Sequence, residues 1–286
     1  MKNNHLFLII LIMFFIGCVY PLGKLATTMI PPLFLASLRV FFLFIFIIPF
    51  FNFVIPKKKF FLLLFFSLSM GFFVYATLYL ALYLSTFVSP IIIGTQLAIP
   101  FGLIISKILL KEKISYKKFF YILSSFFGII IVAYDPRFIT EYLAIISIVI
   151  MAFFYALSNV LSRLLKDIDT VTQIGWHCIV GFVLLFIASC FLEGNPITNL
   201  SQINTDVLLI ILHASLCVSL IGHGGIFYLY KYYPVSKILP FYSLFPIFGI
   251  LLTFLIFFEI PQFYEIVGGI MVIGSVYLIH LDNKKN

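Results

Sequence analysis

The stretch FFLLLFFSLSMGFFVYATLYLALYLSTFVSPIIIGTQLAIPFGLIIS, residues 60–106, contains no Asp, Glu, Lys or Arg. A helix that crosses a membrane needs about 20 residues, so this uncharged stretch is long enough for two crossings. Its only polar break is STFVSP at 85–90. Ser and Pro at such a break favour a turn. We therefore predict two membrane-spanning helices, one on either side of this turn.

The composition of the whole chain extends this prediction. Hydrophobic residues make up 63% of the 286 positions and charged residues only 10%, whereas soluble domains carry about 25% charged residues. Ten spanning helices would use about 200 residues, which leaves room for short loops and no separate soluble domain. The sequence predicts an all-α integral membrane protein with ten transmembrane helices.

The spans follow from the remaining apolar runs. Beside the two within 60–106, they are expected at 6–23, 33–55, 119–134, 142–162, 170–192, 207–230, 238–258 and 266–281. With the N-terminus inside, fourteen Lys and Arg fall in inner segments and only Lys24 and Arg137 in outer ones. This bias predicts cytoplasmic termini. We expect the first helix to be retained; the alternative is a lipoprotein signal ending at Cys18.

The two halves of the chain resemble each other. Three residues in the region of the fourth and fifth spans have counterparts 147 positions later, and the pairs are Gly102 and Gly249, Glu112 and Glu259, and Asp135 and Asp282. The prolines that precede the glycines, Pro100 and Pro246, are 146 positions apart. Five spans per half place the second half upside down. We predict two inverted five-helix repeats, residues 1–138 and 139–286, an arrangement common in secondary transporters.

Several motifs resemble a known family. They are IPPLFLASLR at 30–39, KEK at 111–113, LIGHG at 220–224 and SLFPIFGI at 243–250. The chain resembles the ten-helix EamA family of the drug/metabolite transporter superfamily, and most closely its O-acetylserine/cysteine exporter branch. The resemblance implies a bacterial inner-membrane carrier of small metabolites, often amino acids. It also implies a central cavity lined mainly by spans 1, 3, 4, 6, 8 and 9.

Span 8 carries a polar stripe that is a candidate solute-binding surface. Ser215, Ser219 and His223 are spaced i, i+4 and i+8, which places them on one helical face. Gly222 and Gly224 flank the histidine and are candidate hinges. His223 could donate a hydrogen bond or carry a proton. The alternative is hydrogen bonding between helices, which Ser and His also provide.

Prolines mark equivalent places in the two halves. Pro100 follows Gln96 by four residues, and Pro246 follows Tyr242 by four. A proline inside a helix leaves the carbonyl one turn back without its donor, and in a membrane such a group needs a partner or a cavity. We interpret both prolines as hinge candidates and both polar residues as cavity candidates. A simple kink for packing is the alternative.

Other candidate cavity residues are Tyr155 and Asn159 in span 6 and Tyr75 and Tyr79 in span 3. Core packing would equally explain the span 3 tyrosines. Arg39 is the charge that lies deepest within a span, and such charges are usually functional. It could attract a carboxylate, but we favour an anchor that pairs with outer-loop carbonyls. His177 and Trp176, in the matching place of span 7, are expected at the membrane interface.

The leading hypothesis is a secondary transporter of small metabolites, with efflux favoured over uptake. The alternatives are a membrane-embedded lipid-modifying enzyme and a non-transporting helical scaffold. We expect no catalytic residues, no metal, no cofactor and no nucleic acid; the partners are a small-molecule solute and the lipid bilayer. The oligomeric state stays open, and a monomer would suffice. No Asp or Glu lies mid-span, which favours uniport, exchange or coupling through His223.

Overall fold

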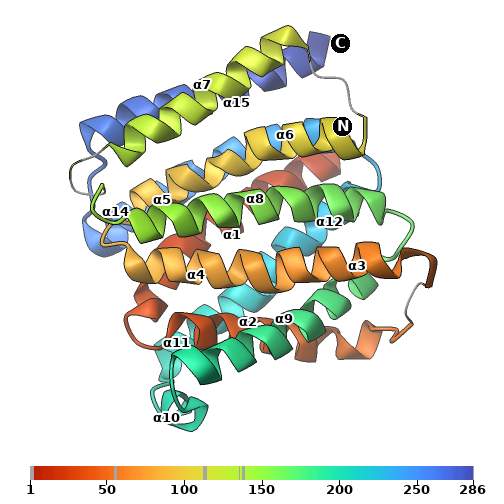
Figure 1. The fold of residues 1–286 in the computed structure, drawn as a ribbon, viewed down its shortest axis with the longest axis vertical. Coiled ribbons are helices and arrows are strands. Elements are labelled where there is room, and N and C mark those ends of the chain that lie inside the picture. The colour runs from red at the N-terminus through yellow and green to blue at the C-terminus, as the bar shows by residue number, and fades with distance from the viewer. Residues whose placement is uncertain (1–2, 55–56, 112–114, 135, 137–138, 286) are drawn as a thin grey trace.

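The computed structural model describes residues 3–54, 57–111, 115–134, 136 and 139–285, and all regular structure in them is helical (Figure 1). Seven helices of the described part are long and apolar enough to cross a membrane. They are Asn4–Thr27, Pro32–Phe50, Lys57–Leu84, Ser89–Leu109, Tyr142–Leu164, Thr170–Leu192 and Thr205–Leu229. Three shorter apolar helices are Phe119–Val132, Phe245–Phe257 and Phe263–Ser275. The expected all-helical membrane fold is confirmed at this level.

The chain runs through these elements in order. The first half contains α1 (Asn3–Thr27), α2 (Pro32–Ile47), η1 (Ile48–Phe50), η2 (Lys57–Lys59), α3 (Phe60–Ser67), η3 (Leu68–Val74), α4 (Tyr75–Leu84), α5 (Ser89–Gly94), η4 (Thr95–Leu97), α6 (Ala98–Leu109) and α7 (Tyr116–Ala133). The second contains α8 (Tyr142–Leu164), α9 (Thr170–Leu192), α10 (Pro196–Leu200), α11 (Thr205–Leu212), η5 (His213–His223), α12 (Gly224–Leu229), α13 (Val235–Ile238), η6 (Leu239–Leu244), α14 (Phe245–Phe257) and α15 (Phe263–Lys285). The turn predicted at 85–90 lies between α4 and α5.

Local sequence explains several helix ends. Pro31 and Pro32 stand at the start of α2, where a proline costs no intrahelical hydrogen bond. The side chain of Asp169 accepts a 2.8 Å bond from the Thr172 amide at the start of α9. Such caps satisfy backbone donors that the helix itself cannot, and each contributes about 1 kcal/mol.

Helical irregularities occur at matching places in the two halves. The third span contains a π-helical segment, η3, and the eighth contains another, η5. The fourth and ninth spans contain 3₁₀ segments, η4 and η6, which come shortly before Pro100 and Pro246. Because a proline cannot donate to the carbonyl four residues back, the tighter 3₁₀ geometry at these places follows from the sequence.

Glycines allow two pairs of helices, α7 with α15 and η3 with α9, to approach very closely. A Cβ on Gly128 of α7 would lie 2.7 Å from the Gly268 carbonyl oxygen of α15, and one on Gly268 would lie 2.6 Å from a methyl group of Val132. A Cβ on Gly71 would lie 2.2 Å from the His177 carbonyl oxygen, so η3 and α9 also touch backbone to backbone. Lipid provides no hydrophobic force between helices, and such close approach replaces it.

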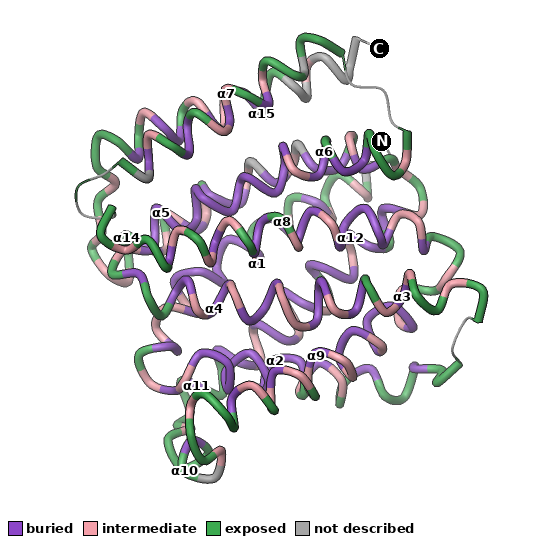
Figure 2. The backbone as a smooth tube through the Cα atoms, viewed as in Figure 1, coloured by how far each residue is buried: buried purple, intermediate pink, exposed green. Residues whose placement is uncertain are grey.

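Burial is concentrated in the middle of the bundle, whereas α7 and α15 form an edge with exposed outer faces (Figure 2). The two ends of the chain lie at the same end of the bundle (Figure 1). We call that end, with Lys59, Arg163 and Tyr230, the basic end. The opposite end, with Glu141, Glu193 and Glu259, is the acidic end. Glu112, Asp135 and the expected repeat boundary at 138 lie outside the described residues, and so does the side chain of Asp282.

Candidate functional site

The centre of the bundle holds a buried arginine. Arg39 of α2 is 1% exposed. Its Nε donates a 2.9 Å hydrogen bond to the Ser219 hydroxyl, and its Nη1 donates a 3.3 Å bond to the Tyr79 hydroxyl. The guanidinium carbon lies 4.5 Å from the ring centre of Tyr75. Hydroxyls and aromatic faces therefore surround this charge.

Expected and observed partners of Arg39 differ. We favoured an anchor to outer-loop carbonyls, but the described partners are side chains deep in the bundle. The sequence could not show the contact with Ser219, because this residue lies 180 positions further along the chain and helix packing brings it to Arg39. The arginine thus belongs to the central cluster instead of the loop region.

The polar stripe of span 8 faces this arginine. The Ser215 hydroxyl lies 2.9 Å from the Arg39 carbonyl oxygen and 2.7 Å from that of Ile211. Ser219 accepts from the guanidinium and donates to the Ala214 carbonyl at 3.0 Å. The His223 ring stacks near Tyr75, with 6.3 Å between ring centres. The π-helical turn of η5 keeps all three side chains directed at α2 and α4.

A small cavity lies at this cluster. Its volume is about 20 Å³, and its walls are Ile16, Val19, Tyr20, Arg39, Val74, Leu78, Met151, Tyr155, Val218 and His223. Such a volume holds about one water molecule. The walls come from spans 1, 2, 3, 6 and 8. Span 2 was not among the helices that the resemblance implied, whereas spans 4 and 9 were implied and do not contribute to these walls.

Spans 4 and 9 supply an adjoining polar contact. The side-chain amide of Gln96 lies 3.4 Å from the Tyr242 carbonyl oxygen, which is the group that Pro246 leaves without its helical donor. The Tyr155 hydroxyl donates a 3.2 Å bond to the Tyr242 hydroxyl. Asn159, one turn along α8, is fully buried. The structure thus joins Gln96 and Tyr242 to the cavity through Tyr155.

Two further residues belong to the centre. His177 was expected at the membrane interface, but it is 0% exposed, and neither ring nitrogen has a partner among the described residues. Its ring centre lies 6.2 Å from that of Tyr75. A signal for this burial was available in the sequence, since His177 occupies the place in span 7 that the buried Arg39 occupies in span 2. Tyr20, which lines the cavity, was not predicted; it precedes Pro21 in span 1.

The hinge candidates have different surroundings. A Cβ on Gly222 would meet nothing closer than the Cys217 carbonyl oxygen at 3.4 Å, and one on Gly224 would meet the end of the Ile174 side chain at 3.0 Å. Gly222 therefore has room for a methyl group. Pro100 and Pro246 are both buried. Close packing does not require a glycine at 222.

Glutamates tie helices together at the acidic end. Glu259, after α14, accepts bonds of 2.9 and 2.8 Å from the amides of Val88 and Ser89 at the start of α5. Glu193, after α9, accepts bonds of 2.7 and 2.9 Å from the amides of Leu33 and Phe34 at the start of α2. Carboxylates suit helix N-termini because of the exposed donors and the dipole. Each glutamate links corresponding spans of the two halves.

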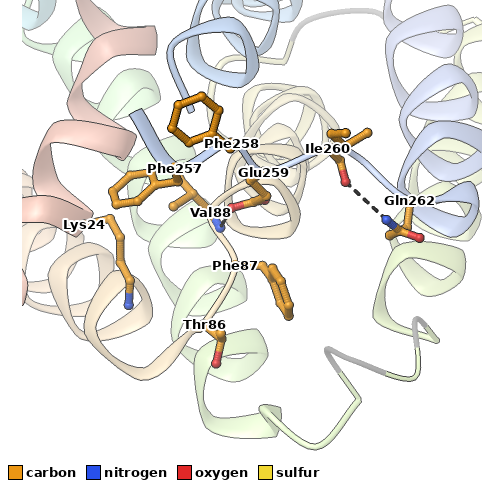
Figure 3. A pocket seen from close by; sticks show the side chains of 9 residues that line it. All are labelled: Lys24, Thr86, Phe87, Val88, Phe257, Phe258, Glu259, Ile260 and Gln262. Carbon is orange, nitrogen blue, oxygen red and sulfur yellow. Dashed lines mark hydrogen bonds between the residues drawn. The ribbon is translucent and has the colours of Figure 1, made fainter. Parts of the chain in front are cut away.

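An open pocket of about 520 Å³ lies beside this contact (Figure 3). Figure 3 shows its charged members arriving from separate elements, Lys24 from α1 and Glu259 from the segment after α14. Lys24 donates to the carbonyl oxygens of Leu82 and Ser85 at 2.9 and 2.5 Å. This bond pattern ties α1 to the end of α4. The pocket is separate from the central cavity, with no lining residue in common.

Two cationic side chains, Lys59 and Arg163, bridge neighbouring segments at the basic end. Lys59 pairs with Asp167 and donates to the Leu164 carbonyl oxygen at 2.9 Å. The hydrogen bond from Lys59 holds the pKa of Asp167 below its usual value. Arg163 donates to the Tyr230 carbonyl oxygen. Polar contacts therefore bridge helices at both ends of the bundle.

Comparisons with known proteins place this geometry in context. The profile of the EamA-like transporter family matches residues 4–134 and 142–281, once in each half. A solved structure titled "Crystal structure of protein" has a TM-score of 0.70 at 13% sequence identity, and the match covers 100% of both chains. At this identity the likeness concerns the fold alone. The search of curated proteins gave no match.

Proposed function

We propose, on the premise that the chain belongs to the EamA-like transporter family, that it moves small metabolites across a membrane by alternating access. In this proposal the seven long and three short apolar helices all cross the membrane. They form two inverted five-helix repeats, 1–138 and 139–286, that rock against each other around the central cluster. The solutes are amino acids or their derivatives, and net flow is outward.

The observation that carries the proposal is the buried cluster around Arg39. A charge in lipid is costly and persists where it serves a pathway or site. The cluster draws partners from both halves, since Arg39 and Tyr79 belong to the first and Ser219 to the second. Inverted repeats bind their solute at this kind of interface. A scaffold has no need for a buried arginine between its halves.

Matched helix breaks give further support. The π segments η3 and η5 and the 3₁₀ segments η4 and η6 occupy corresponding spans. Discontinuous helices in both repeats are the feature that carriers use to build a site near the midplane. The cavity of about 20 Å³ is too small for an amino acid, so the arrangement is compatible with an occluded state between two open ones.

We further propose a bacterial inner-membrane location with both termini in the cytoplasm. In this topology Lys and Arg concentrate in the sequence segments on the same side as both termini, and cytoplasmic loops carry such an excess. Fusions of a reporter that fluoresces only in the cytoplasm, placed at either terminus, should both be bright. A dark fusion at one end would require an odd number of crossings.

The test of transport is counterflow in proteoliposomes. Purified full-length protein is reconstituted, loaded with a panel of unlabelled amino acids, and assayed for uptake of each labelled counterpart. We expect uptake of at least one solute, with a loss of about 10-fold or more in His223→Ala and Asn159→Ala. Gly274→Ala is the control, since its added methyl group would meet no described atom within 4 Å beyond the adjacent backbone of its own helix. Absence of counterflow across the panel would reject the carrier hypothesis.

A further inference from the structure

The guanidinium of Arg39 is incompletely satisfied. Its Nε and Nη1 have the hydroxyls of Ser219 and Tyr79 as partners. Its Nη2 is buried and has no hydrogen-bond partner among the described residues. Arginine offers five N–H donors in a rigid fork, and buried donors are normally paired. The site therefore has spare donors that point to a further acceptor.

The positive charge of Arg39 is also uncompensated. None of the described acidic residues forms an ion pair with it; the ion pair of the described part joins Lys59 and Asp167 at the basic end. The sequence places no Asp or Glu in the middle of any predicted span. A buried charge without a counter-ion costs several kcal/mol. The described residues thus leave the Arg39 guanidinium without a counter-ion.

The residues that line the cavity supply no negative charge to balance Arg39. Apart from Arg39, they comprise aliphatic side chains, Met151, two tyrosines and His223. None of these groups is an anion at neutral pH. The guanidinium is consequently the one fixed charge on the walls, and its planar fork matches the two oxygens of a carboxylate.

We propose that the transported solute carries a carboxylate that pairs with Arg39 when the cavity widens. The inference rests on the proposed function, which it deepens by naming the solute class. A single carboxylate neutralises the single guanidinium and accepts from its unpaired nitrogen. A phosphate dianion would leave excess negative charge among the aliphatic walls. The carboxylate and the guanidinium then neutralise each other, which lowers the cost of the buried charge.

The test compares acids with their amides in the wild-type protein. The melting temperature of the detergent-purified full chain is measured with L-leucine and L-leucinamide, L-phenylalanine and its amide, propionate and propionamide, and inorganic phosphate. We expect at least one carboxylate to raise the melting temperature, and its matched amide to leave it unchanged. The same acids should be taken up in counterflow and the amides should not. This comparison needs no variant to fold.

Variants then assign the effect to Arg39. We expect Arg39→Gln to bind the carboxylate about 10-fold to 100-fold more weakly, as the loss of a charge-assisted hydrogen bond implies. Arg39→Lys keeps the charge without the fork and should retain part of the binding. Lys59→Gln makes the same cation-to-amide change at the basic end, outside the cavity, and should bind as wild type does.

Several results would overturn the proposal. One is an amide that raises the melting temperature or is transported as well as its acid. Others are a melting temperature raised by phosphate but by no carboxylate, or raised by none of these compounds. Undiminished carboxylate binding by Arg39→Gln would also overturn it. Counterflow of solutes that lack a carboxylate, with none of the acids transported, would leave the carrier function standing while rejecting the carboxylate. Absence of counterflow for acids, amides and phosphate alike would instead reject the carrier function.

Discussion

Arg39 Nε and the Ser219 hydroxyl, 2.9 Å apart, form a buried hydrogen bond between the two halves of the chain. The bond joins α2 to the π-helical segment η5. Because Ser219 also donates to the Ala214 carbonyl, its hydroxyl is oriented to accept from the arginine. A movement of one half against the other must stretch or replace this bond, so it couples the site to any rocking motion.

Removal of the Ser219 hydroxyl should therefore be costly. Ser219→Ala leaves a buried charged donor without its acceptor, at a cost of about 1–3 kcal/mol. Ser215→Ala removes a hydroxyl whose described partners are backbone carbonyls, and the expected cost is below about 1 kcal/mol. Thermal unfolding of both variants in one detergent measures the difference. Equal losses would mean that the Arg39 bond does not contribute.

Gly71 should not tolerate a side chain. A Cβ there would lie 2.2 Å from the His177 carbonyl oxygen and 3.1 Å from the Gly181 Cα, so η3 and α9 would have to separate. We expect Gly71→Ala to lose about 1–3 kcal/mol through overpacking. Gly274→Ala, whose methyl group would meet no described atom within 4 Å beyond the adjacent helix backbone, should be neutral or stabilised. Comparable melting temperatures for the two variants would contradict the backbone contact.

Gly222 separates a hinge role from a packing role. Since a Cβ would meet nothing closer than 3.4 Å, Gly222→Ala should fold with a stability within about 1 kcal/mol of the wild type. If helix flexibility at η5 assists alternating access, its counterflow rate should fall several-fold. Melting temperature and counterflow are measured on the same preparation. An unchanged rate would remove Gly222 from the hinge candidates.

The glutamate contacts of the acidic end should stabilise the closed bundle. Glu259→Ala removes the acceptor for the Val88 and Ser89 amides, and we expect a loss of about 0.5–2 kcal/mol, as for other helix caps. Asp167→Ala, whose partner Lys59 lies on the surface, should lose about 0–1 kcal/mol. Unfolding curves of the two variants provide the comparison. A larger loss in Asp167→Ala would be unexpected.

Transport should not require a proton gradient. A proton on His223 would place a second positive charge on the cavity that already holds Arg39, with no described carboxylate to balance it. We expect counterflow and exchange to proceed unchanged when a protonophore collapses the pH gradient. Strong inhibition in the wild type, absent in His223→Ala, would restore this histidine as a proton carrier.

Much of the fold was predictable because its signals are local. Hydropathy indicates which segments prefer lipid, and the prolines at 100 and 246 indicate where a helix must change its hydrogen bonding. The turn after Leu84 lies where the sequence suggested it. The stripe of Ser215, Ser219 and His223 was visible because helical spacing places residues of one chain segment on one face.

The sequence by itself thus determined a helical membrane protein with two similar halves and the helix interruptions near Pro100 and Pro246. Only the tertiary structure decided that Arg39 turns to Ser219 and Tyr79 instead of loop carbonyls, that His177 is buried, and that spans 1, 2, 3, 6 and 8 line the small cavity. The physical reason is distance along the chain. These contacts join side chains from different helices, and helix packing, which no local pattern encodes, fixes which of them meet.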